Sequence, residues 1–331
     1  MVPLSVLDVA PIGSGQTASE TLRASTELAL LAERLGYVRH WFAEHHGMPN
    51  IASSSPEVLI GHIASATRTI RVGSGGIMLP NHAPLRIAEA FHTLEALHPG
   101  RIDLGIGRAP GSDRRVNMAL RPFDPEHYPQ QLQELFSVSR GDFPDDHVFR
   151  GVRAVPSDVS LPPVWLLGSS GGSAALAGSL GTGYGFARHF SPAPPGPALR
   201  AYREAFEPSE RFPEPHVILA VSVVCAPTDE EAERLASTLY LTGVRIHRQE
   251  FRPLPTPEEA LAYEYSPTER IILEQQRARH FVGSPETVRS KLASLVAETD
   301  ADELMVTCMI HGREERHRSY ELLAAAMAEA A

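Results

Sequence analysis

The sequence predicts an α/β barrel of eight parallel strands, a TIM (β/α)8 barrel. Short apolar runs alternate with helical patterns along most of the chain, and eight of these runs have the length of a buried strand. Parallel strands need crossover helices, so repeated βα units indicate a parallel sheet, and eight units can close it into a barrel. The length, 331 residues, suits one such domain spanning 1–331.

The elements follow in order along the chain. The predicted strands are Leu4–Val9, Tyr37–Ala43, Ile70–Met78, Ile102–Gly107, Val164–Gly168, Tyr184–Ala187, Val217–Ala226 and Glu303–Thr307. The predicted helices are Thr17–Leu35, Pro56–Ala66, Pro84–Leu97, Asp229–Leu241, Ser284–Ala297 and Glu314–Ala328, with a further helix opening after Val164–Gly168. Gly36 supplies a C′ residue for the first helix, and Ser55 with Pro56 supplies an N-terminus for the second.

Two stretches depart from the simple repeat, after the fourth and the seventh strands: Pro122–Pro163 and Thr228–Gly283. Such excursions shape access to a barrel's site or pack on its outer wall. Within the second, Leu254–His280 is expected to act as a mobile lid. The alternative fold, an open doubly wound sheet, would need G-x-G-x-x-G after the first strand, and that motif is absent.

Composition excludes several classes of partner. The formal net charge is −10, so nucleic acid and anionic membranes are poor candidates. Cys225 and Cys308 lie far apart in apolar runs, which indicates small core residues rather than a disulfide or a metal site. The chain shows neither a signal peptide nor an apolar run long enough to span a membrane, so a cytoplasmic location is expected.

Reactive residues of such a barrel gather where the strands end, at the C-terminal face. Glu44, His45 and His46 follow the second strand and satisfy this condition. Histidine transfers protons near neutral pH because its unperturbed pKa is about 6.5. The alternative is that these histidines cap carbonyl groups or lie in a solvated loop.

Three further features occupy strand ends. Gly75 and Gly76 interrupt an apolar strand, as expected where a flat ligand approaches the backbone or where the strand bulges. Arg108 ends the fourth strand, where it could bind a phosphate or form a surface ion pair. The Ser169–Ser173 cluster opens a helix, where free N–H groups suit a phosphate, although serine is also an ordinary helix cap.

These segments together resemble the luciferase-like flavin-dependent monooxygenase family. The resemblance rests on WFAEHH, RVGSGGIMLPNHAPLRIAEAFHTLEALHPGRIDLGIGRAPG, PPVWLLGSS and GSPETVRSKL…ADELMV, and it covers nearly the whole chain. It implies a TIM barrel that binds FMN at its C-terminal face, and a homodimer. The family's glutamate before Ser170 is Ser169 here, and GTGYGFARHFSP matches only loosely.

The resemblance also implies roles for individual residues. His45 matches the catalytic histidine, and Gly75–Gly76 match a glycine pair joined by a cis peptide beside the flavin. The expected phosphate ligands are Arg108, Ser170, Gly171 and Ser173, and Arg121 matches a second phosphate-binding arginine. No metal site is expected.

The implied activity is oxidation of a small organic substrate by O2 at reduced FMN, with His45 assisting a proton transfer. A separate flavin reductase would supply the FMNH2, since the sequence holds no nucleotide fingerprint. Two alternatives with this fold remain: a deazaflavin (F420)-dependent hydride-transfer enzyme and a non-catalytic flavin-binding protein. A metal-dependent hydrolase using His45, His46, His82 and Glu44 is a weaker rival, because the first strand lacks H-x-H.

Overall fold

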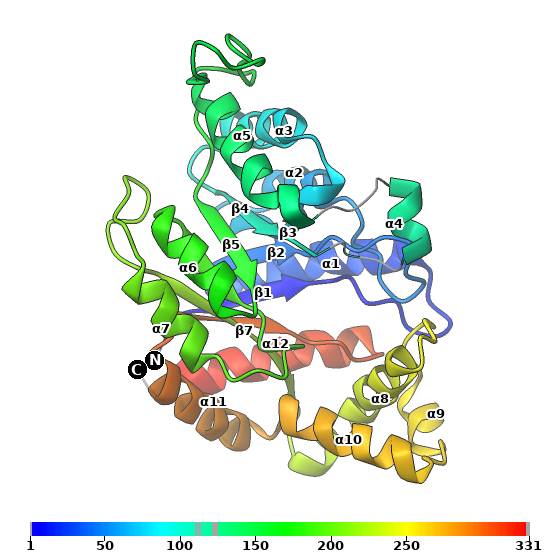
Figure 1. The fold of residues 1–331 in the computed structure, drawn as a ribbon. Coiled ribbons are helices and arrows are strands. Elements are labelled where there is room, and N and C mark those ends of the chain that lie inside the picture. Colours follow the sequence, from blue (N-terminus) through cyan, green and yellow to red (C-terminus); the bar gives the residue numbers. More distant parts are fainter. Residues whose placement is uncertain (1, 110, 112–113, 121–124, 329–331) are drawn as a thin grey trace.

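Eight parallel strands close into a barrel, as predicted (Figure 1). The computed structural model describes residues 2–109, 111, 114–120 and 125–328. Around the barrel the order is β1-β2-β3-β4-β5-β6-β7-β9, and β9 pairs with β1. The strands are β1 Leu4–Asp8, β2 Arg39–Phe42, β3 Arg71–Met78, β4 Ile102–Gly107, β5 Val164–Gly168, β6 Gly183–Phe186, β7 Val217–Cys225 and β9 Glu303–Thr307.

A ninth strand, β8 (Phe281–Gly283), was not predicted from the sequence. It pairs in parallel with the last three residues of β7, beyond the segment Ile218–Ser222 that pairs with β9. All nine residues of β7 are buried, because the strand is covered along its whole length. A three-residue strand has too short a pattern to be recognised by periodicity.

The helices alternate with the strands and surround the barrel (Figure 1). The helices are α1 Ala18–Arg34, α2 Pro56–Ala66, α3 Pro84–Leu97, α4 Arg114–Leu120, α5 Tyr128–Arg140, α6 Gly171–Ser179, α7 Gly196–Glu204, α8 Asp229–His247, α9 Pro257–Leu261, α10 Pro267–Arg279, α11 Pro285–Thr299 and α12 Arg313–Ala328. Thr17 and Glu20 form a capping box that starts α1, and Gly36 follows its end at φ +80°. No helix among the described residues is long and apolar enough to cross a membrane.

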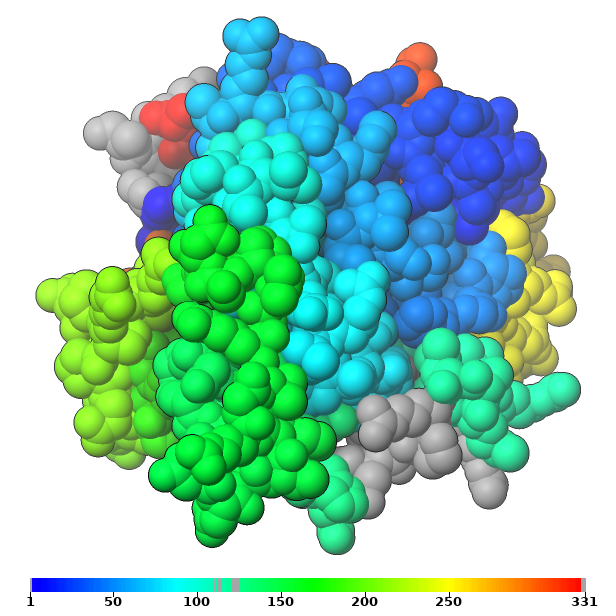
Figure 2. Space-filling model, turned by 90° about the horizontal axis from the view of Figure 1, so that it is seen from above, coloured from blue at the N-terminus to red at the C-terminus, as the bar shows by residue number. Residues whose placement is uncertain are grey.

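The first excursion contains a regular barrel helix. Helix α5 buries Tyr128, Leu132, Leu135 and Val138 and packs beside α3, so this part of the segment belongs to the outer wall. Figure 2 shows that wall from outside, where the segments coloured from blue to green follow one another in chain order. In the second excursion, α9 and α10 pack against α8.

A buried ionic cluster closes the N-terminal end of the barrel. Asp103, fully buried on β4, accepts hydrogen bonds from Arg39 Nη1 at 2.8 Å and from Trp41 Nε1 at 3.1 Å. Arg71 Nη2 also reaches Asp103, at 2.6 Å, and Arg39 Nε lies 3.0 Å from Glu303 Oε2. Two cations and two carboxylates from β2, β3, β4 and β9 therefore neutralise one another inside the barrel.

Replacing Asp103 by Asn should lower the free energy of unfolding by about 3–5 kcal/mol, because the buried guanidinium of Arg39 and the half-buried one of Arg71 lose a carboxylate while the side-chain volume stays nearly constant. Urea unfolding followed by circular dichroism measures this. The control is Asp145→Asn, which removes a surface partner of Arg150 and should cost less than about 1 kcal/mol. Equal stabilities of the two variants would contradict the role assigned to the cluster.

Candidate active site

A cavity of about 640 Å³ opens at the C-terminal ends of the barrel strands. Its floor and walls are mostly apolar, with Leu7, Trp41, Leu167, Ile218 and Met305 pointing in from five different strands. The loops that follow β2, β4, β5 and β6 supply the polar part of the lining. A deep apolar pocket with a few convergent polar groups is the usual form of a small-molecule site.

Eight site residues were proposed from the sequence, and seven of them lie in the described chain. Six of these seven line the cavity: His45, Gly75, Gly76, Arg108, Ser170 and Ser173. Gly171 is not in the lining and begins α6 instead. Arg121 lies outside the described residues. The structure thus gathers residues from the ends of β2, β3, β4 and β5 in one place, while the roles of these residues stay predictions.

The glycine pair on β3 satisfies both explanations considered for it. The peptide bond between Gly75 and Gly76 is cis, as expected, and the pairing with β4 shifts register between Ser74 and Ile77, which marks a bulge. A Cβ on Gly76 would lie 2.6 Å from Leu167 Cδ1 and 2.7 Å from the Gly105 carbonyl oxygen. Packing therefore requires glycine here, and both glycines also line the cavity.

His45 is held by its backbone and by one ring nitrogen. Its N–H donates to the Ser53 carbonyl at 3.0 Å, and its Nδ1 lies 3.3 Å from the Gly111 carbonyl oxygen. A carbonyl can only accept, so Nδ1 carries the proton and Nε2 is the basic nitrogen. Burial lowers the pKa of His45, more than the contact with Gly111 raises it, so the ring is neutral at pH 7.

Glu44 joins β2 to the end of β3. Its carboxylate is 1% exposed and accepts hydrogen bonds from the Met78 N–H at 2.8 Å, His46 Nε2 at 2.8 Å and His82 Nε2 at 2.9 Å. Burial alone would raise the pKa of Glu44, but the hydrogen bonds, led by that from His82, lower it. Glu44 is therefore ionised and fixes the strand end beside the glycine pair.

The opposite end of the lining suits an anion. Ser170 is the N-cap residue of α6, and its Oγ lies 3.4 Å from Ser173 Oγ. Open space surrounds Gly171 and Gly172, and their N–H groups donate no hydrogen bond within the described chain. Arg108 is exposed and makes no ion pair or hydrogen bond with any described residue. A helix N-terminus beside an unpaired arginine is a favourable place for a phosphate.

His189 is a cavity residue that sequence reasoning missed. It follows β6, and its N–H donates to the Ala220 carbonyl at 2.9 Å. Its Nδ1 is buried and has no hydrogen-bond partner in the described chain. Burial lowers the pKa of His189 to about 4, and the nearby His45 adds to this effect. Its position at a strand end could have identified it, by the condition that selected His45.

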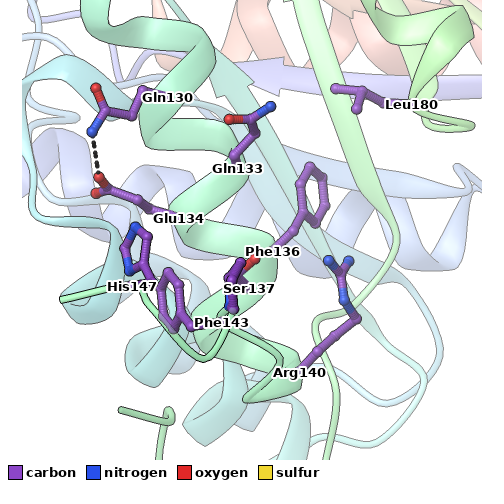
Figure 3. Close-up of a pocket in the computed structure, with 10 residues that line it drawn as sticks. Gln130, Gln133, Glu134, Phe136, Ser137, Arg140, Phe143, His147 and Leu180 are labelled. Atoms are coloured by element: carbon purple, nitrogen blue, oxygen red, sulfur yellow. Dashed lines mark hydrogen bonds between the residues drawn. The ribbon is translucent and has the colours of Figure 1, made fainter. Parts of the chain in front are cut away.

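Other features do not contribute to this cavity. No residue of the expected lid, Leu254–His280, lines it; Leu254 is buried and pairs with Gly13. A second hollow of about 480 Å³ lies outside the barrel along α5, where Gln130 donates to Glu134 (Figure 3), and contains none of the proposed residues. In the described chain, no group of three or more His, Cys, Asp or Glu side chains is placed to hold a metal ion.

The fold and the cavity define a TIM-barrel protein with a small-molecule site at the C-terminal face. The chain belongs to the luciferase-like monooxygenase family, whose model matches residues 2–303. It is 44% identical over 324 residues to the luciferase-like monooxygenase of Escherichia coli (strain K12), covering 97% of this chain and 96% of that protein. It is 46% identical to YvbT of Bacillus subtilis (strain 168), covering 97% and 95%.

Solved structures share the fold. Apo-MsnO8 is 40% identical, with a TM-score of 0.89 and 99% of both chains covered. At 18% identity and a TM-score of 0.72, the oxygenating constituent of 3,6-diketocamphane monooxygenase, solved with FMN, covers 99% of this chain and 98% of its own. An F420-dependent secondary alcohol dehydrogenase, with 14% identity and a TM-score of 0.64, covers 98% of each chain. The last two likenesses concern the fold alone.

The pKa values of two histidines near the cavity should differ in opposite directions from the ordinary value of about 6.5. The pKa of His189 is lowered to about 4, whereas Glu44 raises the pKa of His82 despite the burial of its ring. Nuclear magnetic resonance of the imidazole nitrogens between pH 8 and 4 should find His82 protonated first. The side chain of residue 189 binds a proton more readily in the unfolded chain than in the folded protein. It therefore lowers the free energy of unfolding as pH falls from 6.5 toward 4. His189→Gln should flatten that slope, and earlier protonation of His189 would contradict the assignment.

Proposed function

We propose that this chain is an FMN-dependent monooxygenase that uses O2 to oxidise a small organic substrate. The observation that carries the proposal is the polarity of the cavity: an anion-binding end at Arg108 and α6, and an apolar floor with neutral His45 on its wall. FMN has matching parts, a phosphate and a flat, largely apolar ring. Family membership supports the oxygenase chemistry.

The residues present fit FMN. Ser170, Ser173, the N–H groups of Gly171 and Gly172, and Arg108 would hold the phosphate. The ring would lie near the backbone of Gly75 and Gly76, which lines the cavity together with the apolar side chains of Leu7, Trp41 and Leu167. The apolar side chains exclude water from the reacting atoms.

Bound and reduced FMN supplies the electrons that activate O2, and the protein controls position, water and protons. His45 presents Nε2 as a base because Gly111 occupies Nδ1. A neutral imidazole can take up a proton at Nε2 and return it during turnover. Glu44 positions the adjoining loop through Met78 and the neighbouring histidines.

F420-dependent hydride transfer is the second candidate, since a protein with this fold uses that cofactor. Exchange experiments distinguish the two: FMN should support O2 consumption, whereas F420 would support only substrate-dependent hydride transfer under anaerobic conditions. The proposal includes a separate flavin reductase as the source of FMNH2, and a homodimer as the working assembly.

Replacing Arg108 by Ala should weaken FMN binding by about 1–3 kcal/mol, the contribution of a charge-assisted hydrogen bond. The quenching of flavin fluorescence on titration with protein measures the dissociation constant. Arg150→Ala is the control, because Arg150 is exposed on the loop after α5 and should leave affinity unchanged. An unchanged dissociation constant for Arg108→Ala would remove Arg108 from the phosphate site.

Replacing His45 by Ala should reduce turnover by about 10²–10⁴-fold, the usual contribution of a positioned proton-transfer group. FMN affinity should change little, because the phosphate ligands lie at the ends of β4 and β5. Oxygen consumption with reduced FMN measures the effect. His46→Gln is the comparison: His46 contacts Glu44, lies outside the cavity lining and should affect turnover less. The opposite order would mean that the wrong histidine was chosen.

A further inference from the structure

His45 and His189 stand on opposite walls of the barrel mouth. His45 follows β2, and His189 follows β6, four strands away in the closed ring of eight. Positions four strands apart in an eight-stranded barrel face each other across its axis. Both residues line the same cavity, so a molecule in its centre lies between two histidines.

The structure leaves Nδ1 of the His189 ring without an internal partner. The backbone N–H binds the Ala220 carbonyl, and the ring packs edge-on against Phe190 with centroids 4.7 Å apart. The buried Nδ1 of the ring makes no hydrogen bond within the described chain, although the Ala220 carbonyl raises the pKa of the ring in part. Buried polar atoms in native proteins are normally paired, so an unpaired nitrogen at a cavity indicates a ligand as its partner.

The surroundings of His189 restrict the kind of ligand. The adjoining lining consists of Phe186, Phe190, Ile218, Ala220 and Met305, all apolar. Among the described lining residues, the ionised side chains are Glu44 and Arg108. Glu44 is occupied by His46, His82 and Met78, and Arg108 is assigned above to the FMN phosphate. Arg279 adds to the lowering of the His189 pKa but does not line the cavity. An anionic substrate would therefore find no free counter-charge on the described lining next to His189.

We propose that His189 binds the substrate, as a neutral imidazole that hydrogen-bonds the single uncharged polar group, such as a carbonyl, of an otherwise apolar molecule. The proposal rests on the proposed function, because it places the substrate beside the FMN of that site. It assigns the specificity for the polar group to the β6 wall and leaves the proton transfer to His45 on the β2 wall.

Binding of ketones and of hydrocarbons of the same shape tests the proposal. The probes are cyclooctanone with cyclooctane, and 2-nonanone with nonane. Trp41 lines the cavity and is one of only two tryptophans, so intrinsic fluorescence reports occupancy without any cofactor. The titrations are done on the protein alone and on the FMN-loaded protein, so that a failure of FMN to bind is seen separately from a failure of His189 to recognise the ketone.

His189→Leu should weaken binding of each ketone, relative to binding of its hydrocarbon, at least about 10-fold compared with the wild-type protein, a change equivalent to about 1.4 kcal/mol. The dissociation constant of FMN should stay unchanged. His189→Gln, which keeps a hydrogen-bond donor, should restore part of the lost ketone binding. The control is His62→Leu, because His62 is exposed on α2 and contacts Thr26.

The same ratio of ketone to hydrocarbon dissociation constants in His189→Leu and in the wild-type protein would overturn the proposal, as would a wild-type protein that binds neither compound. If both variants fail to fold, nuclear magnetic resonance of the wild-type protein tests the contact instead. Its His189 ring nitrogens should change their nuclear magnetic resonance shifts on addition of cyclooctanone and not of cyclooctane. Shifts that respond to neither compound would refute the contact.

Discussion

Hydrogen bonds between β6 and β7 close the barrel, and the arrangement of the site depends on that closure. The register Tyr184↔Val217 to Phe186↔Leu219 joins the two ends of an otherwise open sheet. Without it, β2 and β6 would lie far apart along an extended sheet. With it, parallel strands direct all their C-terminal ends to one face, and their inward side chains share one interior.

Charged side chains are arranged differently at the two ends of the barrel. At the N-terminal end, Arg39, Arg71, Asp103 and Glu303 neutralise one another, which fills the interior without a net charge. At the C-terminal end, Glu44 is the one buried carboxylate of the described cavity lining, and its oxygens are occupied by the Met78 N–H and by histidines. The charge left for a ligand is the guanidinium of Arg108, supported by the N-terminus of α6.

Because the polar groups are distributed in this way, groups with different proposed roles lie on different walls of the cavity. The groups that we propose to bind a phosphate follow β4 and β5, the basic nitrogen of His45 lies on the β2 side, and the unpaired Nδ1 of His189 lies on the β6 side. The walls between them are apolar, so each polar group acts in a low-dielectric environment where hydrogen bonds are strong and unpaired groups costly. Both histidines have lowered pKa values for the same reason, burial among those walls.

The sequence by itself determined the eight barrel strands, most of their helices and the group of residues at the strand ends. Alternation of apolar runs and helical periods is local, and strand ends can be read from it. It did not reveal the helices α4, α5, α7, α9 and α10 or the three-residue β8. Packing against neighbouring elements, such as α3 for α5, α6 for α7 and β7 for β8, stabilises such elements more than local pattern does. The sequence also could not show that Glu44 binds His46 and His82, that the lid segment stays outside the lining, or that His189 faces His45. The contact of Glu44 with His46 is a side-chain arrangement within one loop, and that with His82 depends on the pairing of β2 with β3. Only closure of the barrel brings His189, four strands away, to the same cavity as His45.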